Sequence, residues 1–250
     1  MGLKYDIDIP LDSPERTIYH RDIILNKKFL KKLYYQWYDE LTKELPNLPK
    51  QPIIELGSGG GFLKEIHPDV ICTDILDLPS NDMTISALDM PFENQSIGGI
   101  FMIDTLHHIP DMDGFLKEAD RTVGHGGKII MIEPVNSMFG RFIYKNFHHE
   151  PFDPEGSWTI PSTGPLSGAN GALPWIVFER DAKLFKEKYP NFKIEKIQYR
   201  NPLLYLISGG VSFKQLLPDF LYPVVSGFDY ILPKIFKQFS MFQLIVITRK

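Results

Sequence analysis

A glycine-rich run, Gly57 to Gly61, directly follows a short apolar stretch and opens a segment with helical pattern. Glycine lets backbone N–H groups approach a ligand where a side chain would collide. Glu55 stands two residues before the run. A Walker phosphate loop would end in Gly-Lys-Ser/Thr, and a dinucleotide fingerprint would need a small residue where Phe62 or Lys64 stands. The sequence therefore predicts a ligand-binding loop of another kind, and a nicotinamide oxidoreductase is a weaker alternative.

Two carboxylates follow the glycine run at intervals that suit a nucleoside ligand. Asp74 ends the apolar stretch 70–73, and its two acceptor oxygens match the two hydroxyl donors of a ribose. Asp89 stands two residues before Pro91, where an acid commonly caps a turn. We expect both acids to face the ligand of the glycine loop, with turn caps as the alternative.

Two pairs of adjacent histidines are candidate acid–base groups. His107 and His108 follow an apolar stretch, and His148 and His149 precede Glu150. Because neutral histidine accepts a proton near pH 7, we expect His108 or His149 to act as a base, with packed and hydrogen-bonded rings as the alternative. Adjacent histidines point in different directions on a regular element, and no second ligand spacing accompanies the second pair. We therefore expect no metal site.

These residues need a scaffold, and the apolar periodicity predicts one. Apolar residues recur every three or four positions over 21–45, which is typical of an amphipathic covering helix. Short apolar runs predict buried strands, and helical spacing returns between them. The predicted strands are 52–56, 70–74, 99–103, 128–132, 192–199 and 242–248, and the further predicted helices are 113–122 and 179–189. Strands that alternate with helices favour an α/β fold with a doubly wound, mostly parallel sheet.

The composition disfavours several classes of protein. The net charge is -4, from 27 Lys and Arg against 31 Asp and Glu, which argues against nucleic acid as a partner. The single cysteine, Cys72, cannot form an internal disulfide or a zinc cage, so we expect a cytoplasmic protein. No apolar run reaches the roughly 18 residues of a membrane span, so we expect at most peripheral membrane contact. Composition sets no oligomeric state.

We expect one domain over 1–250, in four parts. Residues 1–50 form an N-terminal helical cap, 51–135 the ligand-binding core, and 136–178 an irregular insertion over the sheet edge. The C-terminal part, 179–250, contains the apolar segment 201–239, in which Pro218, Pro223 and Pro233 prevent one long helix. We expect this segment to act as a lid over the pocket in which the substrate binds. The alternative is an exposed apolar surface that meets a lipid-linked substrate or a membrane face.

The string 53–61 resembles the first motif of class I S-adenosylmethionine-dependent methyltransferases. Asp74 lies seventeen residues after Gly57, where that family has the acid that binds both ribose hydroxyls. The stretch 87–92 is similar to the family's D-x-x-x-L-P-F segment, whose acid meets the adenine amino group. The stretch 96–134 resembles the methyltransferase type 11 pattern in order and spacing.

The resemblance implies a Rossmann-like sheet of seven strands with an antiparallel terminal strand, and S-adenosyl-L-methionine as cofactor. The implied cofactor residues are Glu55, Gly57, Ser58, Gly59, Gly61, Asp74, Ile75, Asp89, Met90 and Ile103. The expected substrate contacts are His107, Glu133, His148, Trp175 and Tyr205. The implied reaction is methyl transfer to a hydroxyl or amine of a small molecule or glycan. A cofactor-binding pseudoenzyme or regulatory protein is the alternative.

The chain departs from the family pattern at two places. Ser96-Ile97-Gly98 stands where the family has Ser-Phe-Asp, so that acid is missing. The stretch 75–88 is too short for a full crossover helix and predicts a loop. Three further strings, 150–153, 175–181 and 208–212, resemble a bacterial branch associated with surface-glycan biosynthesis, which implies a glycan acceptor, in one form lipid-linked.

Overall fold

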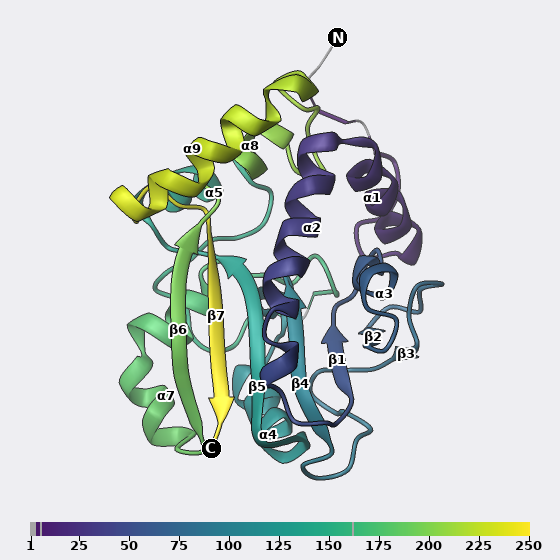
Figure 1. Cartoon of the computed structure of the whole chain (residues 1–250), viewed down its shortest axis with the longest axis vertical. Helices are drawn as coiled ribbons and strands as arrows, with labels where there is room; N and C mark the ends of the chain where they lie inside the picture. Colours follow the sequence, from purple (N-terminus) through teal and green to yellow (C-terminus); the bar gives the residue numbers. More distant parts are fainter. Residues whose placement is uncertain (1–3, 6, 162) are drawn as a thin grey trace.

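A seven-stranded sheet runs through the computed structural model, which describes residues 4–5, 7–161 and 163–250. The strand order is β3-β2-β1-β4-β5-β7-β6 (Figure 1). The strands are β1 (Ile53–Leu56), β2 (Ile71–Asp74), β3 (Met83–Thr84), β4 (Ile97–Ile103), β5 (Val123–Pro134), β6 (Phe192–Arg200) and β7 (Phe242–Arg249). Residues 1–3 and 6 of the expected helical cap lie outside the described residues.

The direction of the strands confirms the predicted fold class. β7 pairs antiparallel with both β5 and β6, and the other pairings, from β3 through β5, are parallel. The carboxyl ends of β1, β2, β4 and β5 therefore share one edge of the sheet, on the side where α8 and α9 lie in Figure 1. In open α/β sheets this edge is where ligands bind.

Helices cover both faces of the sheet, as a doubly wound fold requires. In Figure 1, α2 lies in front of the strands, and α4 and α7 lie behind them. The helices are α1 (Pro14–Asn26), α2 (Lys28–Thr42), α3 (Phe62–Ile66), α4 (Met112–Thr122), α5 (Met138–Phe147), α6 (Leu173–Trp175), α7 (Ala182–Lys188), α8 (Leu204–Ser208) and α9 (Tyr222–Ile235). The stretch after β2 forms a loop and the short strand β3, as its length predicts.

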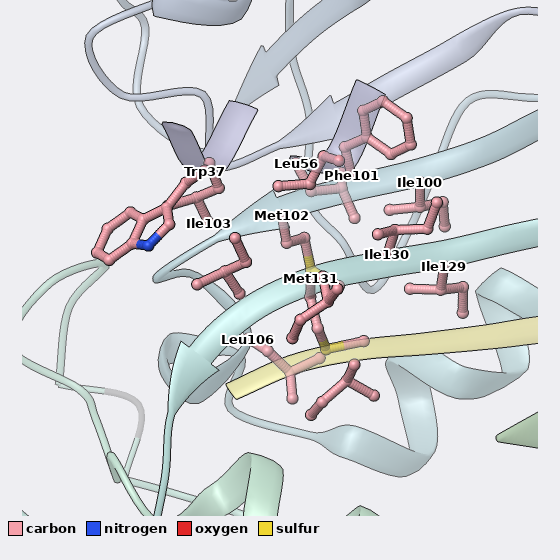
Figure 2. Packing of buried hydrophobic residues seen from close by; sticks show 14 of the residues in the cluster. Trp37, Leu56, Ile100, Phe101, Met102, Ile103, Leu106, Ile129, Ile130 and Met131 are labelled. Atoms are coloured by element: carbon pink, nitrogen blue, oxygen red, sulfur yellow. The ribbon is translucent and has the colours of Figure 1, made fainter. Parts of the chain in front are cut away.

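The core packs against both faces of the central strands because most of the residues in these strands are apolar. All seven residues of β4 are buried. Figure 2 shows Trp37 of α2 at the margin of the side chains that β4 and β5 contribute. The rings of Trp37 and Phe242 lie 4.7 Å apart, and Trp37 Nε1 donates to Asn201 Oδ1 at 2.8 Å. These contacts fix the N-terminal cap to the sheet and to the C-terminal segment.

The predicted single helix over 21–45 is wrong in its extent. The chain forms α1 and α2, which Lys27 separates in an extended conformation with φ -109° and ψ 111°. α1 begins at Pro14 because Ser13 caps it, accepting a hydrogen bond from the Arg16 N–H at 3.3 Å. Lys27 leaves the helix because its buried ammonium donates to the Ser208 carbonyl oxygen at 3.0 Å.

Helices α5 and α6 in the insertion, and α8 and α9 in the segment 201–239, lie where the periodicity predicted none. α5 begins in the insertion after Ser137, whose side chain accepts a hydrogen bond from the Gly140 N–H at 2.8 Å. Pro218 separates α8 from α9, as expected, but Pro223 and Pro233 both lie inside α9. Pro223 occupies the first turn, where its missing N–H costs no hydrogen bond, and Pro233 lies in the last turn. The predicted helix 179–189 is shorter than expected, because Ile176–Arg180 forms a π-helical turn before α7.

Glu55 places a carboxyl group inside this core, at the point where β1 meets the glycine loop. Its side chain is 1% exposed, and Oε2 has no hydrogen-bond partner among the described residues. Burial raises the pKa of Glu55 to about 7, although hydrogen bonds from Ser58, Tyr38 and Cys72 act to lower this pKa. Between pH 4.5 and 7 the folded protein keeps a proton that the unfolded chain has released, so stability falls as the pH rises through this range.

Replacing Glu55 with glutamine removes the ionisable carboxyl and therefore the loss of stability at high pH. We expect Glu55→Gln to raise the free energy of unfolding at pH 8 by about 1 to 3 kcal/mol, and by much less at pH 5. Denaturant unfolding at both pH values measures the difference. The exposed Glu187→Gln variant is the control, and it should change stability little at either pH. Equal effects of Glu55→Gln at both pH values would contradict the buried, proton-binding carboxyl.

Candidate functional site

The loop after β1 brings the backbone close to its neighbours. Gly57 has φ +68°, and a Cβ atom there would overlap the side chain of Thr105. Gly59 has φ +49°, but the nearest atom to a Cβ there would be 3.8 Å away, so its backbone faces open space. The Ser58 N–H donates to the Thr73 carbonyl oxygen of β2 at 2.9 Å. The loop is therefore held firmly on one side and accessible on the other.

Asp74 lies at the end of β2, beside this loop. Its Oδ2 accepts a hydrogen bond from the Gly59 N–H, and its Oδ1 accepts one from the Leu76 N–H, both at 3.0 Å. Burial raises the pKa of Asp74 above its ordinary value, and these backbone donors oppose the shift. Each oxygen keeps acceptor capacity for one further donor.

A cavity of about 560 Å³ opens beside Asp74 and the glycine loop. Its volume lies in the range of small-molecule and cofactor sites, about 300 to 1,000 Å³. The predicted site residues on its wall are Gly57, Ser58, Gly59, Asp74, Ile75, Ile103, His108, His148, His149 and Tyr205. The structure thus brings together residues from both halves of the predicted site.

The structure does not bring every predicted site residue to this cavity. Those away from its wall are Glu55, Gly61, Asp89, Met90, His107, Glu133 and Trp175. Asp89 is exposed and Met90 is buried with its N–H donating to Glu118, whereas the preceding residues 86–88 line the cavity. Asp89 therefore lies away from the cavity wall, where the expected contact with an adenine would be made. Trp175 packs against the core.

Glu133 and His107 form a buried pair behind the cavity wall. Glu133 Oε1 accepts the Thr105 N–H at 2.9 Å and the Leu106 N–H at 2.7 Å, and its Oε2 lies 2.8 Å from His107 Nδ1. Burial opposes the charged imidazole, but the carboxylates of Glu133 and Glu150 raise the pKa of His107 well above its ordinary value. Glu133 thus orients the turn after β4, in place of the expected contact with substrate.

Four histidines surround the carboxylate of Glu150, and we call these five residues the Glu150 cluster. One ring nitrogen each of His107, His108, His148 and His149 lies 3.3 to 3.7 Å from a Glu150 oxygen. Burial opposes the ionisation of Glu150, but the histidines hold the pKa of this carboxyl well below its usual range. Burial lowers the pKa of His108 to about 4 and also lowers that of His148.

Sequence reasoning missed Asp104, which lines the cavity directly after β4. Its backbone has φ +56°, which is uncommon outside glycine, and its N–H donates to the Ile132 carbonyl oxygen at 2.8 Å. Burial raises the pKa of Asp104 to about 7; nearby His107 lowers it, and Glu150 adds to the rise. The available signal was an acid at the carboxyl end of a predicted strand, the same signal that identified Asp74.

The apolar segment 201–239 contributes unequally to the site. Tyr205 of α8 and Val211 lie on the cavity wall, and the Tyr205 ring packs against Phe242 at 4.9 Å. No residue of α9 is on that wall. α8 therefore covers the cavity, whereas α9 lies outside it.

Comparison with known families identifies the core of this site. The family model described as a methyltransferase domain, type 11, matches residues 54–131. No curated protein matches the chain. The matched residues include the glycine loop, Asp74, Asp104 and the turn after β4.

Solved structures share the whole fold at low sequence identity. An S-adenosylmethionine-dependent methyltransferase from Thermotoga maritima is 17% identical, covers 94% of both chains and has a TM-score of 0.50. Phosphoethanolamine N-methyltransferase 2 from Haemonchus contortus, bound to phosphomonomethylethanolamine and S-adenosylhomocysteine, is 14% identical with a TM-score of 0.53. The match covers 96% of this chain and 59% of that one.

Geranyl diphosphate C-methyltransferase from Streptomyces coelicolor, bound to Mg²⁺, geranyl-S-thiolodiphosphate and S-adenosylhomocysteine, is 13% identical with a TM-score of 0.50. The match covers 96% of this chain and 84% of that one. The strand order, the glycine loop and the family match agree: the chain has the fold of these methyltransferases, and its residues 54–131 match the model of a methyltransferase domain.

Proposed function

We propose that this protein transfers the methyl group of S-adenosylmethionine to a hydroxyl or amine of a small-molecule or glycan acceptor. The observation that carries the proposal is the shared cavity: the glycine loop, Asp74, Asp104, His108 and Glu150 all line it. The glycine loop and Asp74 suit the cofactor, and the other three residues offer proton-accepting groups to an acceptor. The same domain could bind the cofactor without transfer, and the Asp104 experiment below separates the two cases.

The residues present fit the cofactor. The open space over Gly59 admits a ligand against the backbone, which a Cβ atom would obstruct. Asp74 retains one acceptor site on each oxygen, which matches two ribose hydroxyls. Ile75, Ala87 and Leu88, which line the cavity, offer apolar side chains for the adenine to pack against. Bound here, the cofactor supplies a methyl group that its sulfonium already activates.

The task left to the protein is alignment and removal of a proton. Holding two reactants in line supplies up to about 7 to 11 kcal/mol of the barrier. A general base works best when its pKa is near the working pH, and Asp104, with a pKa of about 7, meets this condition better than His108, with a pKa of about 4. We therefore place the base at Asp104. His108 and His149, which the sequence suggested, orient the acceptor in this proposal.

The outer surface of α9 suits an acceptor held in a lipid. Val224, Phe228, Ile231 and Ile235 recur along one stripe of α9 and are each about half exposed or more, from 49% to 78%. Met138 and Phe142 extend the apolar surface onto α5, and the Met138 N–H donates to Gln238 just beyond α9.

We propose that this surface, with Lys234 and Lys237 beside it, rests on an anionic membrane that presents a lipid-linked glycan. No described helix combines the length and apolarity that a bilayer crossing requires. A cytoplasmic location, supported by the single buried Cys72, completes the proposal.

Cofactor binding is tested at Asp74. We expect Asp74→Ala to weaken S-adenosylhomocysteine binding by ~1 to 3 kcal/mol, about 5- to 150-fold, because two buried hydroxyls lose their acceptors. Asp74→Asn keeps one acceptor oxygen and should lose less. Titration calorimetry gives the dissociation constants, and exposed Asp77→Ala is the matched control. An unchanged dissociation constant in Asp74→Ala would contradict the contact between the ribose and Asp74.

The base is tested through the pH dependence of transfer. A base must be deprotonated, so we expect transfer of a labelled methyl group to a metabolite extract to fall as the pH drops below about 7. Asp104→Asn should lower transfer about a hundredfold while S-adenosylhomocysteine affinity stays within about twofold. A rate that stays level down to pH 5 would place the base elsewhere. Binding without transfer in the unaltered protein would indicate a cofactor-binding regulator.

Membrane contact is tested by flotation with anionic liposomes. We expect the protein to float, and the double variant Phe228→Ser, Ile235→Ser to remain in the soluble fraction, because it loses two of the four exposed apolar side chains of the stripe. Leu184→Ser, which changes an exposed leucine on α7, is the control and should float like the unaltered protein. Complete recovery of the unaltered protein in the soluble fraction would contradict the membrane contact.

A further inference from the structure

The spacing within the Glu150 cluster is unusual for a hydrogen-bonded network. The four ring nitrogens lie 3.3 to 3.7 Å from the Glu150 oxygens, beyond the usual range of about 2.7 to 3.2 Å for N–H···O bonds. Two ligand atoms that share one tetrahedral ion, each about 2.1 Å from it, lie about 3.4 Å apart. The cluster therefore has the spacing of a ligand set.

The two histidines after β4 are held as metal ligands usually are. His107 Nδ1 lies 2.8 Å from Glu133 Oε2, and His108 Nδ1 lies 3.0 Å from the Gly168 carbonyl oxygen. Since a carbonyl can only accept, His108 Nδ1 carries the proton and its Nε2 presents a lone pair. Metal-binding histidines almost always donate their other ring N–H to a carboxylate or a carbonyl, which fixes the tautomer and the ring orientation.

A buried atom without a partner points into the same place. The His107 side chain is 1% exposed, and its Nε2 has no hydrogen-bond partner among the described residues. A polar atom in this position is costly unless something binds it. Glu150 Oε2, 3.3 Å away, is its nearest ionic neighbour, so a cation between the two would satisfy both.

We propose that His107 Nε2, His108 Nε2 and the Glu150 carboxylate bind one divalent transition-metal ion. The ligand atoms of these three residues all lie within 4.8 Å of one another. Two imidazoles with one carboxylate suit zinc, iron(II), cobalt or manganese, whereas magnesium and calcium prefer oxygen ligands alone. His148 and His149, which form a second such group with Glu150, are placed to add a ligand.

The sequence argued against a metal because one histidine pair stood alone, and the fold changes that argument. His148, His149 and Glu150 lie in the insertion, about forty residues beyond His107 and His108, and the folded chain brings both pairs to one carboxylate. The alternative to a metal ion between His107 Nε2 and Glu150 Oε2 is a proton on Nε2, which would make the two side chains a buried ion pair. The experiment below distinguishes a bound metal ion from a proton.

The proposed ion has a consequence for the acceptor, which rests on the proposed methyl transfer. His108 and Glu150 line the cavity, so an ion bound to them lies at its wall. An acceptor oxygen bound to such an ion loses its proton more readily. The metal site would therefore favour acceptors with a hydroxyl or phosphate oxygen. The site itself does not depend on the transfer reaction.

Metal binding is measured on the full chain after treatment with a chelator. We expect calorimetry with Zn²⁺ to show one ion bound per chain with a dissociation constant in the micromolar range or below. We expect bound Co²⁺ to give a visible absorption band of the kind seen for ions with a low coordination number. His108→Ala and Glu150→Gln should each weaken Zn²⁺ binding at least about tenfold. His67→Ala and His125→Ala, which lie outside the cluster, are the matched controls and should bind Zn²⁺ unchanged.

Failure of the metal site and failure of the methyltransferase proposal are distinguishable on the same samples. S-adenosylhomocysteine titration and thermal unfolding accompany each variant, so loss of the fold is not mistaken for loss of the site. Absence of Zn²⁺ and Co²⁺ binding in protein that binds S-adenosylhomocysteine would overturn the metal site alone. Zn²⁺ binding that survives in both His108→Ala and Glu150→Gln would also overturn it.

Discussion

A buried carboxylate, Glu133 at the end of β5, holds the loop on which the acceptor side of the cavity depends. One oxygen accepts two backbone N–H groups of the turn after β4, and the other faces His107 Nδ1. Hydrogen bonds to a buried charged group are stronger than those between neutral groups. Losing one leaves a buried polar group without a hydrogen-bond partner, which destabilises the fold. The turn is therefore held in one conformation, which keeps Asp104 and His108 at the cavity wall.

The two sides of the site come from one edge of the sheet but from different kinds of structure. The cofactor side is local: β1, its loop and the end of β2 suffice to place Gly59 and Asp74. The acceptor side requires the turn after β4 and the insertion, which carries Glu150 back against His107. This division fits a fold whose cofactor site is common to many enzymes and whose insertions vary with the acceptor.

The sequence predicted most of the sheet and the position of the glycine loop at the end of a strand beside Asp74, because both depend on short stretches of chain. Gly57 and Asp74 each follow an apolar strand, so their positions could be inferred from local pattern alone. Asp89 could not be placed, because one turn decides whether its side chain or residues 86–88 face the cavity. The positions of Asp104 and of the Glu150 cluster depend on contacts between distant segments, which local pattern does not reveal. Helix α5 was not predicted because its aromatic and glycine residues show no clear helical periodicity.

The crystal structure of the protein with S-adenosylhomocysteine tests the central claim most directly. The account predicts ribose hydroxyls on the Asp74 carboxylate, the amino-acid part along the backbone of Gly57 to Gly59, and the sulfur atom facing Asp104. The adenine should lie against Ile75 and residues 86–88. Ligand density outside this cavity, or a ribose that does not contact Asp74, would contradict it.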